Sequence, residues 1–168
     1  KFFSCFVPDV GKIDENKIHY GCPISEEELG RRYRLNLTNR PFWLNNEFVF
    51  LGEIPENKSA DIDDTALVHK TNEGIFIITG CSHSGIINII NYAKQVCKEG
   101  RILGVLGGFH FLKKSEEELE EICSLMLEAG VNPEYPLYPC HCCDLKSKII
   151  MSKFFNVQEV CTGDVLNC

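Results

Sequence analysis

The feature that most constrains the fold is an alternation of strand-like and helix-like segments from residue 64 to near the end of the chain. The apolar runs with the length of buried strands are residues 65–70, 74–79, 101–106, 135–138 and 157–161. Helical patterns occupy residues 84–99, 115–130 and 144–154. This alternation predicts an α/β layer with helical crossover connections.

The remaining part of the chain has a different character. Residues 1–55 predict a β-rich, irregular segment, in which residues 25–32 could form one short helical turn. Its strand signals are residues 1–7, 16–24, 33–38 and 47–54. Residues 56–63 are polar and predict a loop. A length of 168 residues suits one ordinary domain, so we expect a single domain over residues 1–168, with the alternating layer over 56–168.

Composition excludes several classes of protein. The chain has 17 Lys and Arg against 24 Asp and Glu, a net charge of −7, which argues against a sequence-independent nucleic-acid binder. No apolar run approaches the roughly 20 residues of a membrane helix, and no signal peptide opens the chain. We therefore expect neither a nucleic-acid nor a membrane partner.

Cysteine usage indicates the compartment. Ten cysteines in 168 residues are a smaller proportion of the chain than the roughly 8–10% that is typical of a small disulfide scaffold. We expect mostly free thiols in a reducing, cytoplasmic compartment. A secreted disulfide protein is the alternative, because the count is even.

Three histidines share one sequence context. His83, His110 and His141 each lie just past the carboxyl end of a predicted strand and before a helix. Those strand ends share one edge of an open α/β sheet, where ligands bind. Imidazoles brought together there can hold a divalent metal or serve acid–base chemistry. His19 and His69 lack this context and are interpreted as structural.

Neighbouring residues allow several interpretations. Gly107 and Gly108, beside His110, would let the backbone approach a ligand closely. Cys140 and Cys143 form a C-x-x-C between a strand and a helix, as in thioredoxin, although buried small hydrophobes are the plainer interpretation. The pair Asp63-Asp64 could supply ligands or form a plain turn, and the turn is the favoured interpretation. The acidic run after Ser115 predicts a capped, solvated helix start.

Five motifs in succession resemble a branch of the metallo-β-lactamase superfamily of metal-dependent hydrolases. They are Leu51-Gly52-Glu53-Ile54-Pro55, Asp63-Asp64-Thr65-Ala66-Leu67, Thr79-Gly80-Cys81-Ser82-His83-Ser84-Gly85-Ile86, Gly107-Gly108-Phe109-His110 and Pro139-Cys140-His141-Cys142. The resemblance implies an αββα sandwich with a metal site at one edge of its two sheets.

The resemblance also implies a ligand set and a reaction. His83, His110, His141 and Cys81 are its candidate metal ligands, with His141 similar to the last histidine ligand of the superfamily. Either Cys81 or His83 would replace the bridging aspartate. Zinc or another divalent metal would supply a bound water that attacks a small-molecule ester or related bond in the intact enzyme. Gly107, Gly108 and His110 are the candidate substrate-binding residues, and the substrate class by analogy is a small phosphorylated or pterin-like molecule.

One departure from the superfamily is large, because the ligand motif H-x-H-x-D-H occurs nowhere in the 168 residues. We therefore expect the C-terminal portion of such an enzyme, with zinc weak or absent and no activity in this chain alone. A non-catalytic binding or assembly module that lost the metal is the alternative, and a redox protein using Cys140 and Cys143 is a further one.

The partial sandwich also predicts self-association. One sheet face, carrying Ile75, Ile77, Ile102 and Val105, would lack cover. We expect a homo-oligomer to cover it, unless residues 1–54 or a missing N-terminal half do so.

Overall fold

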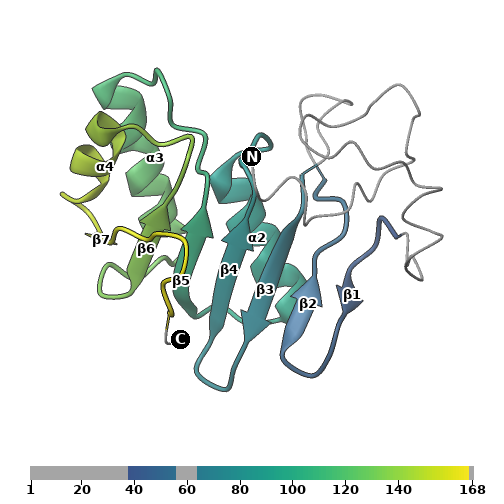
Figure 1. Cartoon of the computed structure of the whole chain (residues 1–168). Helices are drawn as coiled ribbons and strands as arrows, with labels where there is room; N and C mark the ends of the chain where they lie inside the picture. Colours follow the sequence, from purple (N-terminus) through teal and green to yellow (C-terminus); the bar gives the residue numbers. More distant parts are fainter. Residues whose placement is uncertain (1–37, 56–63, 167–168) are drawn as a thin grey trace.

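The described strands form one mixed sheet in chain order (Figure 1). The computed structural model describes residues 38–55 and 64–166. The strands are β1 (Phe42–Trp43), β2 (Phe48–Phe50), β3 (Ala66–Lys70), β4 (Ile75–Thr79), β5 (Ile102–Gly107), β6 (Pro136–Pro139) and β7 (Asn156–Val157). Neighbours from β1 to β4 are antiparallel, and neighbours from β4 to β7 are parallel.

Three helices connect the parallel strands, which confirms the predicted α/β layer. They are α2 (Ile86–Cys97), α3 (Glu116–Glu128) and α4 (Leu145–Met151). Each crossover moves to the next strand in the same direction, so right-handed connections place all three helices on one face. They lie behind the sheet in the view of Figure 1. None of the helices in the described part of the chain is long and apolar enough to cross a membrane.

Some predicted boundaries differ from those observed. The strand predicted over 157–161 is reduced to the two residues of β7, at the edge of the sheet, and α4 ends at Met151 rather than at 154. The strand β1 was not predicted, and it pairs with β2 through a turn in which the Asn45 side chain accepts the N–H groups of Glu47 and Phe48. The elements predicted over 1–7, 16–24 and 25–32, most of the 33–38 strand and the 56–63 loop lie outside the described residues.

The core lies between the sheet and the helices. One row of side chains crosses five strands in register and is fully buried: Val49, Val68, Ile77, Val105 and Leu137. It packs in one cluster with the buried faces of α2, α3 and α4. Ile75 and Ile102 are buried in the same cluster. The prediction that Ile75, Ile77, Ile102 and Val105 lie on an uncovered face is therefore wrong, because the handedness of the crossovers puts the helices over them.

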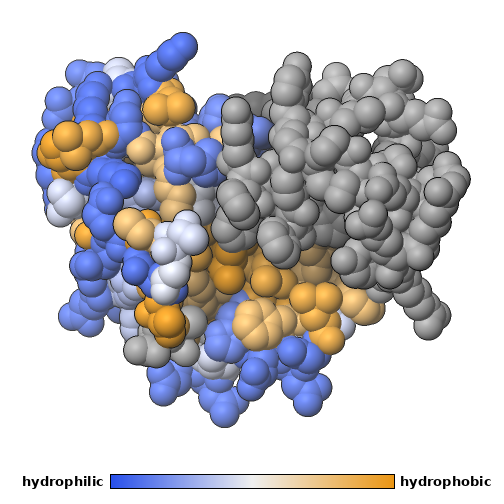
Figure 2. Space-filling view, viewed as in Figure 1, coloured by the Kyte–Doolittle hydropathy of each residue, from blue (hydrophilic) through white to orange (hydrophobic). Residues whose placement is uncertain are grey.

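The adjacent register row points to the other face of the sheet, since strand side chains alternate. It consists of Phe50, Leu67, Ile78, Leu106 and Tyr138, all half-buried. Figure 2 is viewed from this side and shows an apolar area over the sheet. The face without helices is thus apolar, although with different residues from those predicted.

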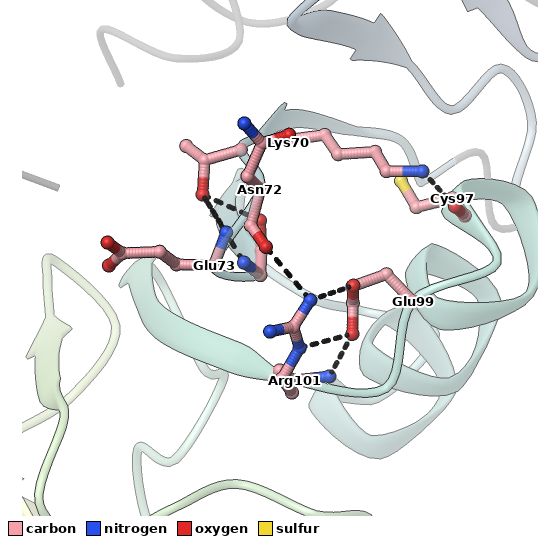
Figure 3. A network of polar contacts seen from close by, with 8 residues as sticks. Lys70, Asn72, Glu73, Cys97, Glu99 and Arg101 are labelled. Carbon is pink, nitrogen blue, oxygen red and sulfur yellow. Dashed lines mark hydrogen bonds and ion pairs between the residues drawn. The ribbon is translucent and has the colours of Figure 1, made fainter.

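A polar network closes the end of the sheet where β4 and β5 begin (Figure 3). The Arg101 guanidinium donates to the Glu99 carboxylate at 2.8 and 3.0 Å and to the Asn72 carbonyl at 3.0 Å. These hydrogen bonds from Arg101 hold the pKa of Glu99 at about 2. The Lys70 ammonium donates to the Cys97 carbonyl at 2.7 Å. The network connects the β3–β4 turn to the end of α2. His83, His110 and His141 lie at the opposite ends of the strands, outside this network.

Candidate metal centre

The loops after β4, β5 and β6 meet at one edge of the sheet, and the structure brings the three predicted histidines together there. Cys81, His83 and His110 form one group whose possible ligand atoms all lie within 4.8 Å of one another. Cys81, His141 and Cys142 form a second group by the same criterion. Cys81 belongs to both groups, so the two are contiguous. His69 lies elsewhere, stacked on Phe48 in the sheet, and His19 is outside the described residues.

Unusual backbone conformations build the loops of this edge. Ser82 and His110 have φ values of 53° and 58°, in the left-handed region. Such conformations cost on the order of 1–3 kcal/mol in residues other than glycine and cluster at functional sites. The buried Ser82 hydroxyl lies 3.3 Å from the Thr79 hydroxyl, which helps to hold the turn that presents Cys81 and His83.

The glycines after β5 are in close contact with other residues of the site, and no ligand is needed to explain them. A Cβ at Gly108 would lie 2.6 Å from both the Cys142 sulfur and the His141 ring. The Gly108 N–H also donates to the Gly80 carbonyl at 2.7 Å. Gly107, with a φ of +140°, lies against the Thr79 backbone. Substrate binding by Gly107 and Gly108 stays a prediction, whereas their role in close packing is observed.

Asp64, for which the sequence analysis favoured a turn over a ligand, lies beside the candidate site. It is only 8% exposed, its carboxylate accepts the Ser84 N–H at 2.5 Å, and it lies 3.9 Å from Nδ1 of His83. Interpretation of Asp64 as a plain turn residue was therefore wrong, because the fold buries it beside the β4–α2 loop. A carboxylate next to a histidine orients the imidazole ring, as second-shell carboxylates do in metal sites.

The two histidines of the first group lie in contact and reach solvent. The rings of His83 and His110 meet edge to face with centroids 4.9 Å apart. Both side chains are exposed, as is His141. Nδ1 of His110 lies 3.6 Å from the Cys81 sulfur. Nitrogen and sulfur donors at this edge are therefore open to an ion arriving from solvent.

The thiols in and around the second group have pKa values shifted in opposite directions. The pKa of Cys142 falls to about 5 because its sulfur accepts hydrogen bonds from Cys143, Cys81 and the N–H of His110, and these outweigh burial. The His110 bond is 3.0 Å long. Burial and the Cys142 thiolate raise the pKa of Cys81 to about 12. The pKa of Cys143 rises because its thiol hydrogen-bonds to Cys142 and is buried.

The C-x-x-C pair does not have the electrostatics of a thioredoxin site. Cys140 and Cys143 are both free thiols, and burial also raises the pKa of Cys140. A thioredoxin-type nucleophile needs a lowered pKa instead. The thiol with a lowered pKa is Cys142, which lies between them in the sequence.

The donors present fit a divalent metal that accepts nitrogen and sulfur. Imidazole nitrogen and thiolate sulfur are the usual ligands of zinc. The absence of a Cβ at Gly108 leaves the space that His141 and Cys142 occupy. The site is therefore suited in both chemistry and packing to hold such an ion.

The fold is similar to that of a metal-dependent hydrolase of the β-lactamase superfamily. A solved structure of one such hydrolase superposes with a TM-score of 0.66 at 30% sequence identity, covering 77% of this chain and 56% of that one. The mixed sheet with its helices matches that fold. No family model matches the sequence.

Two curated proteins of Methanocaldococcus jannaschii are similar in sequence. An uncharacterized protein is 26% identical over 144 residues, which cover 78% of this chain and 54% of that protein. A 7,8-dihydropterin-6-methyl-4-(beta-D-ribofuranosyl)-aminobenzene-5'-phosphate synthase is 25% identical over 93 residues, 55% of this chain and 31% of the synthase. The chain thus spans about half the length of the first of these relatives and less of the second.

Proposed function

We propose that this chain forms part of a metal-dependent hydrolase of the metallo-β-lactamase superfamily, and that Cys81, His83, His110 and His141 hold its divalent metal. The observation that carries the proposal is the convergence of these donors at one sheet edge. Similarity to a solved metal-dependent hydrolase supports it independently. Zinc is the metal that this donor set favours, and a reducing, cytoplasmic setting would keep the thiols free.

The proposed reaction is hydrolysis of an ester or related bond in a small molecule. A bound divalent metal would lower the pKa of water and polarise the bond under attack. The chain's own residues do the positioning: the Asp64 carboxylate orients His83, and Gly108 leaves space for His141. The exposed rings of His110 and His141 can accept or deliver a proton at the mouth of the site.

Metal-dependent turnover tests the proposal. The assay uses the product of the whole gene, so that any ligands outside these 168 residues are present, and p-nitrophenyl acetate and bis(p-nitrophenyl) phosphate as probes. We expect activity that chelation removes, and at least a roughly 100-fold loss in His141→Ala. His69→Gln, a histidine outside the site, should retain activity. Rates no higher than the uncatalysed background with metal supplied would contradict the proposal and favour the non-catalytic binding module.

We also propose that the helix-free face of the sheet is covered by a second copy of the chain. Its row Phe50, Leu67, Ile78, Leu106 and Tyr138 is apolar and only half-buried. Contiguous apolar surface of this kind mostly occurs at interfaces. An N-terminal half outside this chain is the other possible cover, and it would leave the chain monomeric when expressed with that half.

A further inference from the structure

We propose that Cys142, together with Cys81 and His141, forms a thiolate-rich site that binds one thiophilic divalent ion such as Zn²⁺ in preference to Mg²⁺ or Mn²⁺. The inference rests on the proposed function for the location of the site. It adds a ligand, Cys142, and it names the class of metal. The sequence motifs predicted His83, His110, His141 and Cys81 as ligands and left Cys142 out.

The geometry of the group fits a tetrahedral ion. Ligand atoms around a tetrahedral zinc lie roughly 3.5–3.8 Å apart, given zinc–sulfur and zinc–nitrogen bonds of about 2.3 and 2.0 Å. The donor atoms of Cys81, His141 and Cys142 are already within 4.8 Å of one another. They need to close by about 1 Å, which side-chain rotation can supply.

The two overlapping groups differ in their chemistry. The group of Cys81, His83 and His110 offers one sulfur and two nitrogens, and both histidines are exposed. The group of Cys81, His141 and Cys142 offers two sulfurs, one of them on a buried residue. Soft thiolates select zinc or Cu(I), whereas Mg²⁺ and Mn²⁺ prefer oxygen ligands. The second group is therefore the more selective for a thiophilic ion.

Neighbouring backbone supports the sulfur of Cys142 as a ligand. The His110 N–H donates to this sulfur at 3.0 Å. Hydrogen bonds to ligand atoms are the usual second shell of a metal site. Cys81 and Cys142 come from separate loops, after β4 and β6, so their meeting depends on the whole sheet and not on a local turn.

Cobalt substitution tests the proposal on the 168-residue chain, kept reduced with a phosphine. Co²⁺ reports each cobalt–sulfur bond as charge-transfer absorption, whether or not the chain has activity. We expect Cys142→Ser and Cys81→Ser each to lose about half of this intensity, since each removes one of two sulfurs. Cys140→Ser, in the same loop but outside both groups, should leave it unchanged. Mg²⁺ and Mn²⁺ in excess should not displace the cobalt, whereas Zn²⁺ should.

Each other outcome overturns the proposal. No charge-transfer band in the wild-type chain would mean that the thiols bind no metal. Full intensity in Cys142→Ser would mean that Cys142 is not a ligand of the ion. If Cys142→Ser does not fold, X-ray absorption of the zinc-loaded wild-type chain decides: two sulfurs at about 2.3 Å are expected, and one sulfur refutes. Cobalt binding without turnover in the whole gene product would refute the proposed hydrolase while leaving this site in place.

Discussion

Replacement of Gly108 by alanine should disturb the candidate metal site directly. The new Cβ would lie 2.6 Å from the Cys142 sulfur, 2.6 Å from Cε1 of His141 and 2.9 Å from the Gly80 carbonyl oxygen. Ordinary contacts between such atoms are about 3.5–4.0 Å, so two proposed ligands must each move by about 1 Å. Overpacking of this size costs about 1–3 kcal/mol in the free energy of unfolding.

The same displacement should weaken metal binding. Changes to groups that support metal ligands typically lower affinity by about 10–100-fold, which is about 1.4–2.8 kcal/mol. Urea unfolding measures the stability, and titration with Co²⁺ measures the affinity. Gly80→Ala is the matched control, because no atom lies within 4 Å of a Cβ there. A Gly108→Ala chain with wild-type stability and affinity would refute the argument that this glycine makes room for His141 and Cys142.

Four further predictions concern other parts of the molecule. Asp64→Ala should cost about 1–3 kcal/mol in urea unfolding, because the part-buried Ser84 N–H loses its carboxylate acceptor; an unchanged midpoint would contradict this. Ser115→Ala should lower stability by about 1 kcal/mol in thermal unfolding, since the Ser115 hydroxyl accepts the Glu118 N–H in the capping box at α3. The folded-state pKa of Glu99 is lowered from 4.5 to about 2, so its stabilisation is complete above pH 4.5 and is lost as the pH falls towards 2. The difference in Tm between wild type and Glu99→Gln should therefore shrink over that range, and a constant difference would argue against the Arg101 pairing. Finally, Leu106→Thr should shift sedimentation towards the monomer if a second copy covers the helix-free face, and an unchanged monomer would exclude that contact.

The pattern of the sequence was enough for most of the alternating layer. The strands β3 to β6 and the helices α2 and α3 lie within two residues of their predicted bounds. Short continuous apolar runs are typical of buried strands, and apolar residues at helical spacing are typical of amphipathic helices. The capping box at Ser115 forms as the local residues predict. The edge strands were the weak point: β1 and β7 have two residues each, too few for a periodic signal.

Some residues of the candidate site could be predicted from the sequence, and others only from the structure. A repeated local context, strand then histidine then helix, was sufficient to place His83, His110 and His141 at one edge. It could not identify Asp64 as a neighbour of His83, or Cys142 as a neighbour of His110. Asp64 lies 20 residues before Ser84, to which it hydrogen-bonds, and Cys142 lies 32 residues after His110. Such contacts exist only once the sheet has brought separate loops together.

Sequence alone also determined that β4 and β5 would be buried, since their residues are apolar on both faces. It could not determine which face the helices cover. That choice follows from the handedness of three successive crossovers in one direction, which buries the row of Ile77 and Val105 and leaves Ile78 and Leu106 half-exposed. Neighbouring residues on one strand differ only in which side of the sheet they face, and the tertiary structure decides what lies on each side.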